Sequence, residues 1–113
     1  MKELMKIKDL LDLLPLKVVV NGDLEREITG GCVSDLLSHV MARGKDGNVW
    51  ITIQSHQNIV AVASLLNFSA IIVAGGVEID DKTIEKAKKE GINILTIDED
   101  IYQVAGKLYS LGI

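Results

Sequence analysis

Five consecutive apolar residues, Ala70 to Ala74, lie between two segments whose apolar residues recur at helical spacing. A strand without a polar residue is typically covered on both faces, as in a parallel sheet with helices on each side. The helical face before it carries Ile59, Val62, Ala63 and Leu66, and a charged helix is expected from Lys82 to Glu90. This succession predicts a layered α/β domain.

The same alternation of strand and helix extends over the whole chain. Further strands are predicted at Lys17–Val20, Val49–Ile53 and Ile92–Ile97. Further helices are predicted from Leu4 to Leu14, from Val33 to Met41 with Ser34 as its cap, after Ser55 as a cap, and from Ile101 to Leu108. We therefore expect one three-layer α/β domain spanning residues 1–113, with a mostly parallel sheet of about four strands flanked by helices.

Charge and composition exclude several kinds of partner. The net charge is −4, the lysines after position 81 alternate with glutamates, and only four residues are aromatic. Nucleic acid and anionic membranes are therefore not expected partners. Cys32 is the only cysteine, which rules out an internal disulfide and fits a reducing compartment. No apolar run reaches about 20 residues and no signal peptide is evident, so we expect a cytoplasmic protein.

Five polar residues follow the predicted strand at 49–53, namely Gln54, Ser55, His56, Gln57 and Asn58. Ligands of open α/β sheets bind outside the carboxyl ends of the strands, and helix N-termini favour anions. One interpretation is that these five side chains bind a ligand. The alternative, that Ser55 caps a helix while the others face water, stays open.

Thr29, Gly30 and Gly31 form a second candidate, interpreted as a turn that opens the second helix. Glycines allow close approach of a phosphate, but they serve any tight turn equally well. We expect this turn to meet residues 54–58 at one edge of the sheet. Gly75-Gly76 is interpreted as a plain turn, because the carboxylates that follow it would repel an anion.

The sequence around the two histidines does not support catalysis or metal binding by them. His56 could act as a general base, but no nucleophile or orienting acid accompanies it. His39 is expected to pair with Asp35 on one helix face, and Cys32 with the two histidines lacks the spacing of a metal site. A P-loop, a dinucleotide fingerprint and a nucleophile elbow are all missing. We expect a non-catalytic domain without cofactor or metal.

The chain resembles the DRTGG domain family. Glu27-Ile28-Thr29-Gly30-Gly31 occupies the place of the family's pentapeptide, with Thr-Gly-Gly kept and Asp-Arg replaced. Three further segments are similar to short family members, namely Val33–Leu37, Trp50–Asn58 and Ala74–Gly76. The resemblance runs from about Leu4 to Leu111.

That resemblance implies a fold similar to the N-terminal domain of HPr serine kinase/phosphorylase, without the P-loop domain a kinase would need. The family also occurs beside CBS domains in nucleotide-regulated pyrophosphatases. It therefore implies regulation, with an adenine nucleotide as a possible ligand and with dimerisation as a second role.

Two functions remain in competition. The first is a regulatory domain that binds a small anionic metabolite or nucleotide at the strand-end loops. The second is an interaction module that forms a homodimer or docks on a larger enzyme. The second is motivated by a first helix with more apolar residues than one core stripe needs, namely Leu4, Met5, Ile7, Leu10, Leu11, Leu13 and Leu14.

Overall fold

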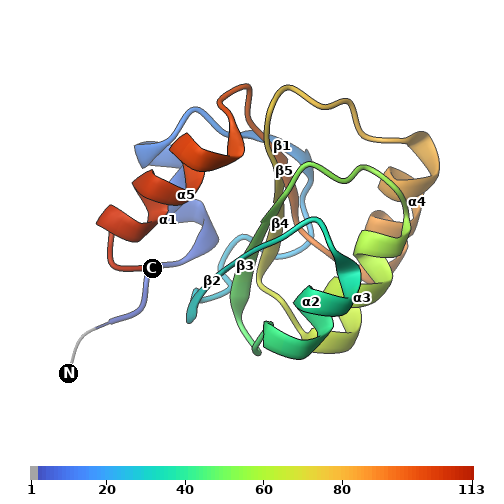
Figure 1. Ribbon diagram of the computed structural model, residues 1–113, viewed down its shortest axis with the longest axis horizontal. Coiled ribbons are helices and arrows are strands. Elements are labelled where there is room, and N and C mark those ends of the chain that lie inside the picture. Colours follow the sequence, from blue (N-terminus) through green and yellow to red (C-terminus); the bar gives the residue numbers. More distant parts are fainter. Residues whose placement is uncertain (1–2) are drawn as a thin grey trace.

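The computed structural model describes residues 3–113 as one α/β domain with a central five-stranded sheet (Figure 1). The strands are β1 (Lys17–Val20), β2 (Gly30–Val33), β3 (Asn48–Thr52), β4 (Ala70–Val73) and β5 (Ile94–Thr96). The helices are α1 (Ile7–Leu13), α2 (Leu37–Arg43), α3 (Asn58–Leu66), α4 (Asp81–Glu90) and α5 (Ile101–Ser110). The expected fold class is confirmed.

The sheet is mixed, with the strand order β1-β5-β4-β3-β2. Strands β2 to β5 are parallel, whereas β1 pairs antiparallel with β5 at one edge. Among the described residues the sheet has one strand more than the four expected. The additional strand is Gly30–Val33, and its Cys32 pairs with Trp50 of β3. These four residues begin with two glycines and have little strand propensity of their own. Their extended conformation is stabilised by pairing with the neighbouring strand β3.

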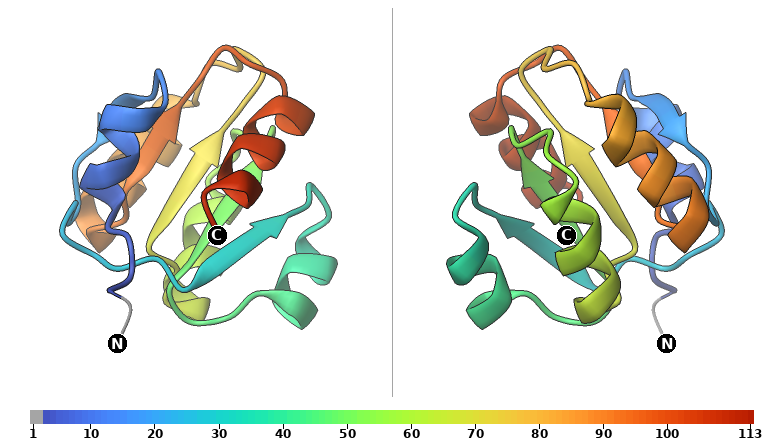
Figure 2. Two further views of the ribbon diagram at one scale, coloured as in Figure 1. Left: turned by 90° about the vertical axis from the view of Figure 1, so that its left-hand side faces the viewer. Right: turned by 90° about the vertical axis from the view of Figure 1, so that its right-hand side faces the viewer.

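Helices cover both faces of the sheet. Helices α1 and α5 lie on one face, and α2, α3 and α4 lie on the other (Figures 1 and 2). The side chains of β4 alternate between these layers: Ile72 packs in the cluster with α1 and α5, and Ile71 and Val73 pack in the opposite cluster. The apolar run at 70–74 is therefore buried on both sides, as its composition predicts.

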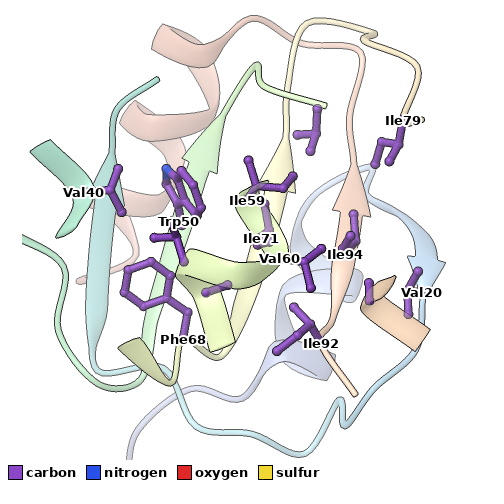
Figure 3. Packing of buried hydrophobic residues seen from close by; sticks show 14 of the residues in the cluster. Val20, Val40, Trp50, Ile59, Val60, Phe68, Ile71, Ile79, Ile92 and Ile94 are labelled. Carbon is purple, nitrogen blue, oxygen red and sulfur yellow. The ribbon is translucent and has the colours of Figure 1, made fainter. Parts of the chain in front are cut away.

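Trp50 and Phe68 form the aromatic centre of the layer beneath α2 and α3 (Figure 3). Their ring centroids lie 5.9 Å apart with an interplanar angle of 67°, an edge-to-face contact. The indole Nε1–H of Trp50 donates to the carbonyl of Ser34 at 2.8 Å. This bond fixes the chain directly after β2 against the neighbouring strand β3.

Several helix ends follow from local sequence, and two expected caps are wrong. Helix α1 stops before Pro15, Gly91 ends α4 in the left-handed conformation with φ of +71°, and Asp100 caps α5 by accepting from the Gln103 N–H. By contrast, α2 begins three residues after Ser34 and α3 three residues after Ser55. Both serine hydroxyls bond elsewhere, as described below. Within residues 3–113, no helix has the length and apolar character needed to cross a membrane.

Candidate functional site

The eight residues predicted to bind a ligand divide into two groups at opposite ends of the sheet. Gly30 pairs with Asn48 at the beginning of β3, whereas residues 54–58 follow its end at Thr52. Because β2 and β3 are parallel, the whole length of β3 separates Thr29 from the 54–58 loop. The expectation that they share one pocket is therefore wrong. The error comes from interpreting Gly30-Gly31 as a turn before a helix when these glycines begin a strand.

Three side chains of residues 54–58 are hydrogen-bonded within the protein. The Gln54 side-chain Nε2 donates to the Asp35 carbonyl at 2.8 Å, and the Ser55 hydroxyl lies 3.3 Å from Asp80 Oδ1. His56 Nδ1 accepts from the backbone N–H of Asn58 at 3.2 Å and thereby satisfies one free donor at the start of α3. These contacts tie neighbouring loops together.

Asp35 is the organising residue of the loops after β2 and β3. Its Oδ1 accepts from the Thr52 hydroxyl at 2.7 Å and from the Ile53 N–H at 2.9 Å. The expected pair with His39 is therefore wrong: Asp35 precedes α2 and its carboxylate faces β3. Ser34 acts locally, accepting from the Leu36 N–H at 3.1 Å.

Carboxylates surround the remaining loops at the same end of the sheet. Gly75 and Gly76 form the expected turn, with φ of +78° and +68°, and it is held by Gly75 N donating to the Glu99 carbonyl at 2.8 Å. The chain around this turn carries Glu78, Asp80, Asp81, Asp98, Glu99 and Asp100. An anion would meet a negative potential here, which disfavours this edge as its site.

A polar groove of about 660 Å³ lies beside the edge strand β2, between it and α2. Thr29, Gly30 and Gly31 line it, together with the basic side chains of His39, Arg43 and Lys45. No aspartate or glutamate is among its lining residues. The nearby carboxylate of Asp46 accepts from the side-chain Nδ2 of Asn67 at 3.0 Å. The groove is thus a basic site on an acidic chain.

Thr29 connects the start of β2 with the turn that precedes β3. Its hydroxyl donates to the Asp46 carbonyl at 2.7 Å and accepts from Asn48 Nδ2 at 3.2 Å, while its N–H donates to the Gly47 carbonyl at 3.0 Å. The Asn48 Oδ1 in turn accepts from the Lys45 N–H at 3.1 Å. Thr29 therefore positions the segment that carries Lys45 into the groove.

Arg43, Lys45 and His39 were missed as site residues by the sequence reasoning. The available signal is the pair of basic residues in Arg43-Gly44-Lys45, which the turn Asp46-Gly47-Asn48 separates from the predicted strand at Val49–Ile53. It gains meaning only once Gly30–Val33 is known to lie beside α2. Cys32 also lines this groove, but its side chain is largely buried, and burial raises the pKa of its thiol.

A second groove, of about 390 Å³, lies on the other face of the sheet between β2 and α5. Its lining is mostly apolar and includes Gly31, Val33, Tyr102, Tyr109 and Ile113. Gly31 and Val33 thus take part in both grooves. Among residues 3–113 there is no group of three or more His, Cys, Asp or Glu side chains that could hold a metal ion.

A mixed sheet with helices on both faces, whose edge strand β2 begins directly after Thr29, places this domain in the α/β class. The chain belongs to the DRTGG domain family, whose family model matches residues 9–111. A similar solved structure comprises the CBS and DRTGG domains of the regulatory region of Clostridium perfringens pyrophosphatase, complexed with its activator diadenosine tetraphosphate. The TM-score is 0.74 at 24% sequence identity, over 91% of this chain and 45% of that one. No curated protein matches the sequence.

Proposed function

We propose that this DRTGG domain is a non-catalytic regulatory domain that binds a small anionic metabolite or nucleotide in the groove between β2 and α2. The observation that carries the proposal is the lining of that groove, which combines three basic side chains with no carboxylate on a chain of net charge −4. A guanidinium and an ammonium held close together suit a phosphate group, the first as a planar fork and the second as a point charge.

Of the predicted ligand-binding residues, Thr29, Gly30 and Gly31 belong to this proposed site. Thr29 holds the Lys45 segment in place, and the glycines leave the wall of the groove free of side chains. The other five predicted residues lie at the opposite end of the sheet, namely Gln54, Ser55, His56, Gln57 and Asn58. There, the side chain of Gln54 contacts Asp35 and that of Ser55 contacts Asp80. We propose that residues 54–58 hold neighbouring loops together. Ligand binding by these residues is not part of the present proposal.

Adenine nucleotides are the first ligands to test. The regulatory region of the Clostridium perfringens pyrophosphatase, which shares this fold, is complexed with an adenine dinucleotide activator. The match covers 45% of the chain of that regulatory region, so transfer of its ligand is part of the proposal.

The test is a titration of the isotope-labelled domain with ATP, diadenosine tetraphosphate and inorganic phosphate, followed by backbone amide chemical shifts. We expect saturable shifts at Gly30, Gly31, Arg43 and Lys45, with smaller changes around Gln54 to Asn58. Absence of shifts with every one of these anions at millimolar concentration would refute the proposal. Shifts confined to residues 54–58 would move the site to the other end of the sheet.

Self-association or docking on a larger enzyme is the second candidate function. Exposed apolar side chains favour it: Val33, Tyr102 and Tyr109 are 44%, 85% and 81% exposed beside the apolar groove. The first helix contributes less than expected, because Ile7, Leu10 and Leu14 are buried in the core. Light scattering over a range of protein concentrations tests this function, and a strict monomer without a stable partner would argue against it.

A further inference from the structure

We infer that two copies of this chain associate by antiparallel pairing of their β2 strands across a two-fold axis at Cys32. This inference deepens the self-association proposed above, because it names the surface, the partner and the register. It does not depend on anion binding.

The two edges of the sheet differ in their protection against such pairing. The edge strand β1 carries Lys17, and its register with β5 shifts between Val18 and Val20. A lysine and a bulge are devices that keep strand edges from pairing with other chains. The edge strand β2 reads Gly30-Gly31-Cys32-Val33, with no charge in it and continuous register with β3. β2 is therefore the edge open to another strand.

The hydrogen-bond pattern determines which groups of β2 are free. In a parallel pair, alternate residues direct both their N–H and their C=O to the neighbouring strand. Ser34 N donates to the Ile51 carbonyl at 3.3 Å, so the even-numbered residues face β3. The N–H and C=O groups of Gly31 and Val33 consequently point to the open edge.

Only one antiparallel register uses all of these free groups. Pairing Gly31 of one copy with Val33 of the second copy, and the reverse, makes four backbone hydrogen bonds and places the two Cys32 residues opposite each other. A shift by one residue would place the free backbone groups of one copy opposite residues of the other copy whose backbone groups point to β3, so these hydrogen bonds could not form. A shift by two would lose half of the bonds. Such a self-complementary contact is the kind that a two-fold dimer requires.

Side chains on the α5 face fit the same arrangement. Gly31 and Val33 both line the apolar groove, with Tyr102 and Tyr109 beside them. In the inferred register, each Val33 lies opposite the Gly31 of the other copy, where there is no side chain to displace. The 44% of Val33 that is exposed, together with the two tyrosines, would then be covered by equivalent groups.

The test compares the native chain with Val33→Pro and Val33→Thr. Proline removes the outward N–H of residue 33 and is tolerated at a strand edge whose N–H faces solvent, whereas threonine keeps both that N–H and a β-branched shape. We expect sedimentation velocity to show a dimer for the native chain and for Val33→Thr, and a folded monomer for Val33→Pro. A native chain that is monomeric at every concentration, or a folded Val33→Pro that remains dimeric, would overturn the inference.

Amide hydrogen exchange provides the residue-level test and covers the case in which Val33→Pro does not fold. In the native chain, the Gly31 and Val33 amides should exchange at least about tenfold more slowly in concentrated than in dilute samples. Equal rates would contradict the pairing. The outcome is distinct from that of the anion titration, because sedimentation of the native chain needs no anion: a native dimer that binds no ATP, or a native monomer that binds ATP, separates the two proposals.

Discussion

Thr29 packs directly against Gly47: a Cβ atom placed on Gly47 would lie 2.6 Å from Thr29 Cγ2 and 2.9 Å from its hydroxyl oxygen. Gly47 also has φ of +80°, a conformation that side-chain-bearing residues rarely adopt. The threonine of the Thr-Gly-Gly motif and the glycine of the turn before β3 therefore form one structural unit.

Gly47→Ala should destabilise the domain by about 2–4 kcal/mol, because the left-handed backbone and the contact with Thr29 both oppose a side chain. Gly91→Ala is the matched control: its φ is +71°, but an added Cβ would meet nothing within 4 Å. Gly91→Ala should therefore lose only about 1 kcal/mol of stability, the cost of the left-handed backbone conformation for a residue with a side chain. Urea denaturation of both variants measures the difference. Equal losses would mean that the Thr29 contact contributes nothing.

Asn93→Ala should cost about 3 kcal/mol or more. Asn93 is 1% exposed, its Oδ1 accepts from Gly22 N and Asp23 N at 2.8 Å each, and its Nδ2 donates to the carbonyls of Asp23 and Ser69. The alanine would leave the buried Ser69 carbonyl, and the part-buried backbone groups of Gly22 and Asp23, without this partner. Thermal unfolding measures the effect, with the exposed Asn58 changed to alanine as a control that should remain near the native stability. A loss at Asn93 no larger than that control would contradict the assigned role.

Arg43→Gln and Lys45→Gln should each weaken anion binding by about tenfold, corresponding to the loss of one charge-assisted hydrogen bond worth about 1.5 kcal/mol. The control is Lys86→Gln on α4, outside the groove, which removes the same charge without removing a contact. Calorimetric titration with ATP is the measurement. If all three variants lose the same affinity, net charge rather than the groove governs binding.

Cys32 should react slowly with alkylating reagents. Burial raises the pKa of its thiol, so the thiolate that reacts is scarcer at pH 8 than in the unfolded chain. For the same reason the neutral thiol favours the folded state below its unfolded pKa of about 8.5, and this contribution is lost as pH rises through the higher folded value.

The measurement is the iodoacetamide rate at pH 8 for folded and for urea-unfolded Val33→Pro, a variant chosen so that dimer contacts do not add protection. The folded chain should react more slowly. Equal rates would show that the thiol is not shielded by its own domain.

Most of the fold could be predicted because it depends on local or periodic signals. The apolar run at 70–74 predicts a doubly covered strand, and the helices predicted up to Leu14 and up to Glu90 end beside Pro15 and Gly91 in the structure. Each of these features acts through the residue's own backbone or its nearest neighbours. They required no knowledge of distant contacts.

The site could not be predicted in the same way, because it depends on partners far apart in sequence. Ser55 bonds to Asp80, which lies 25 residues away, so it does not cap the helix that follows it. Asp35 faces Thr52 and not His39, because its carboxylate satisfies the end of β3. In both cases a local interpretation was available, and a long-range hydrogen bond replaced it.

The sequence alone determined the alternation of strands and helices, since apolar periodicity and helix termini are properties of short segments. Tertiary structure decided that Gly30–Val33 is an edge strand, because its extended form depends on pairing with β3. That pairing separates Thr29 from residues 54–58 and brings it beside Arg43 and Lys45. The physical reason is that a strand is stabilised by hydrogen bonds to another segment, whereas a helix contains its own.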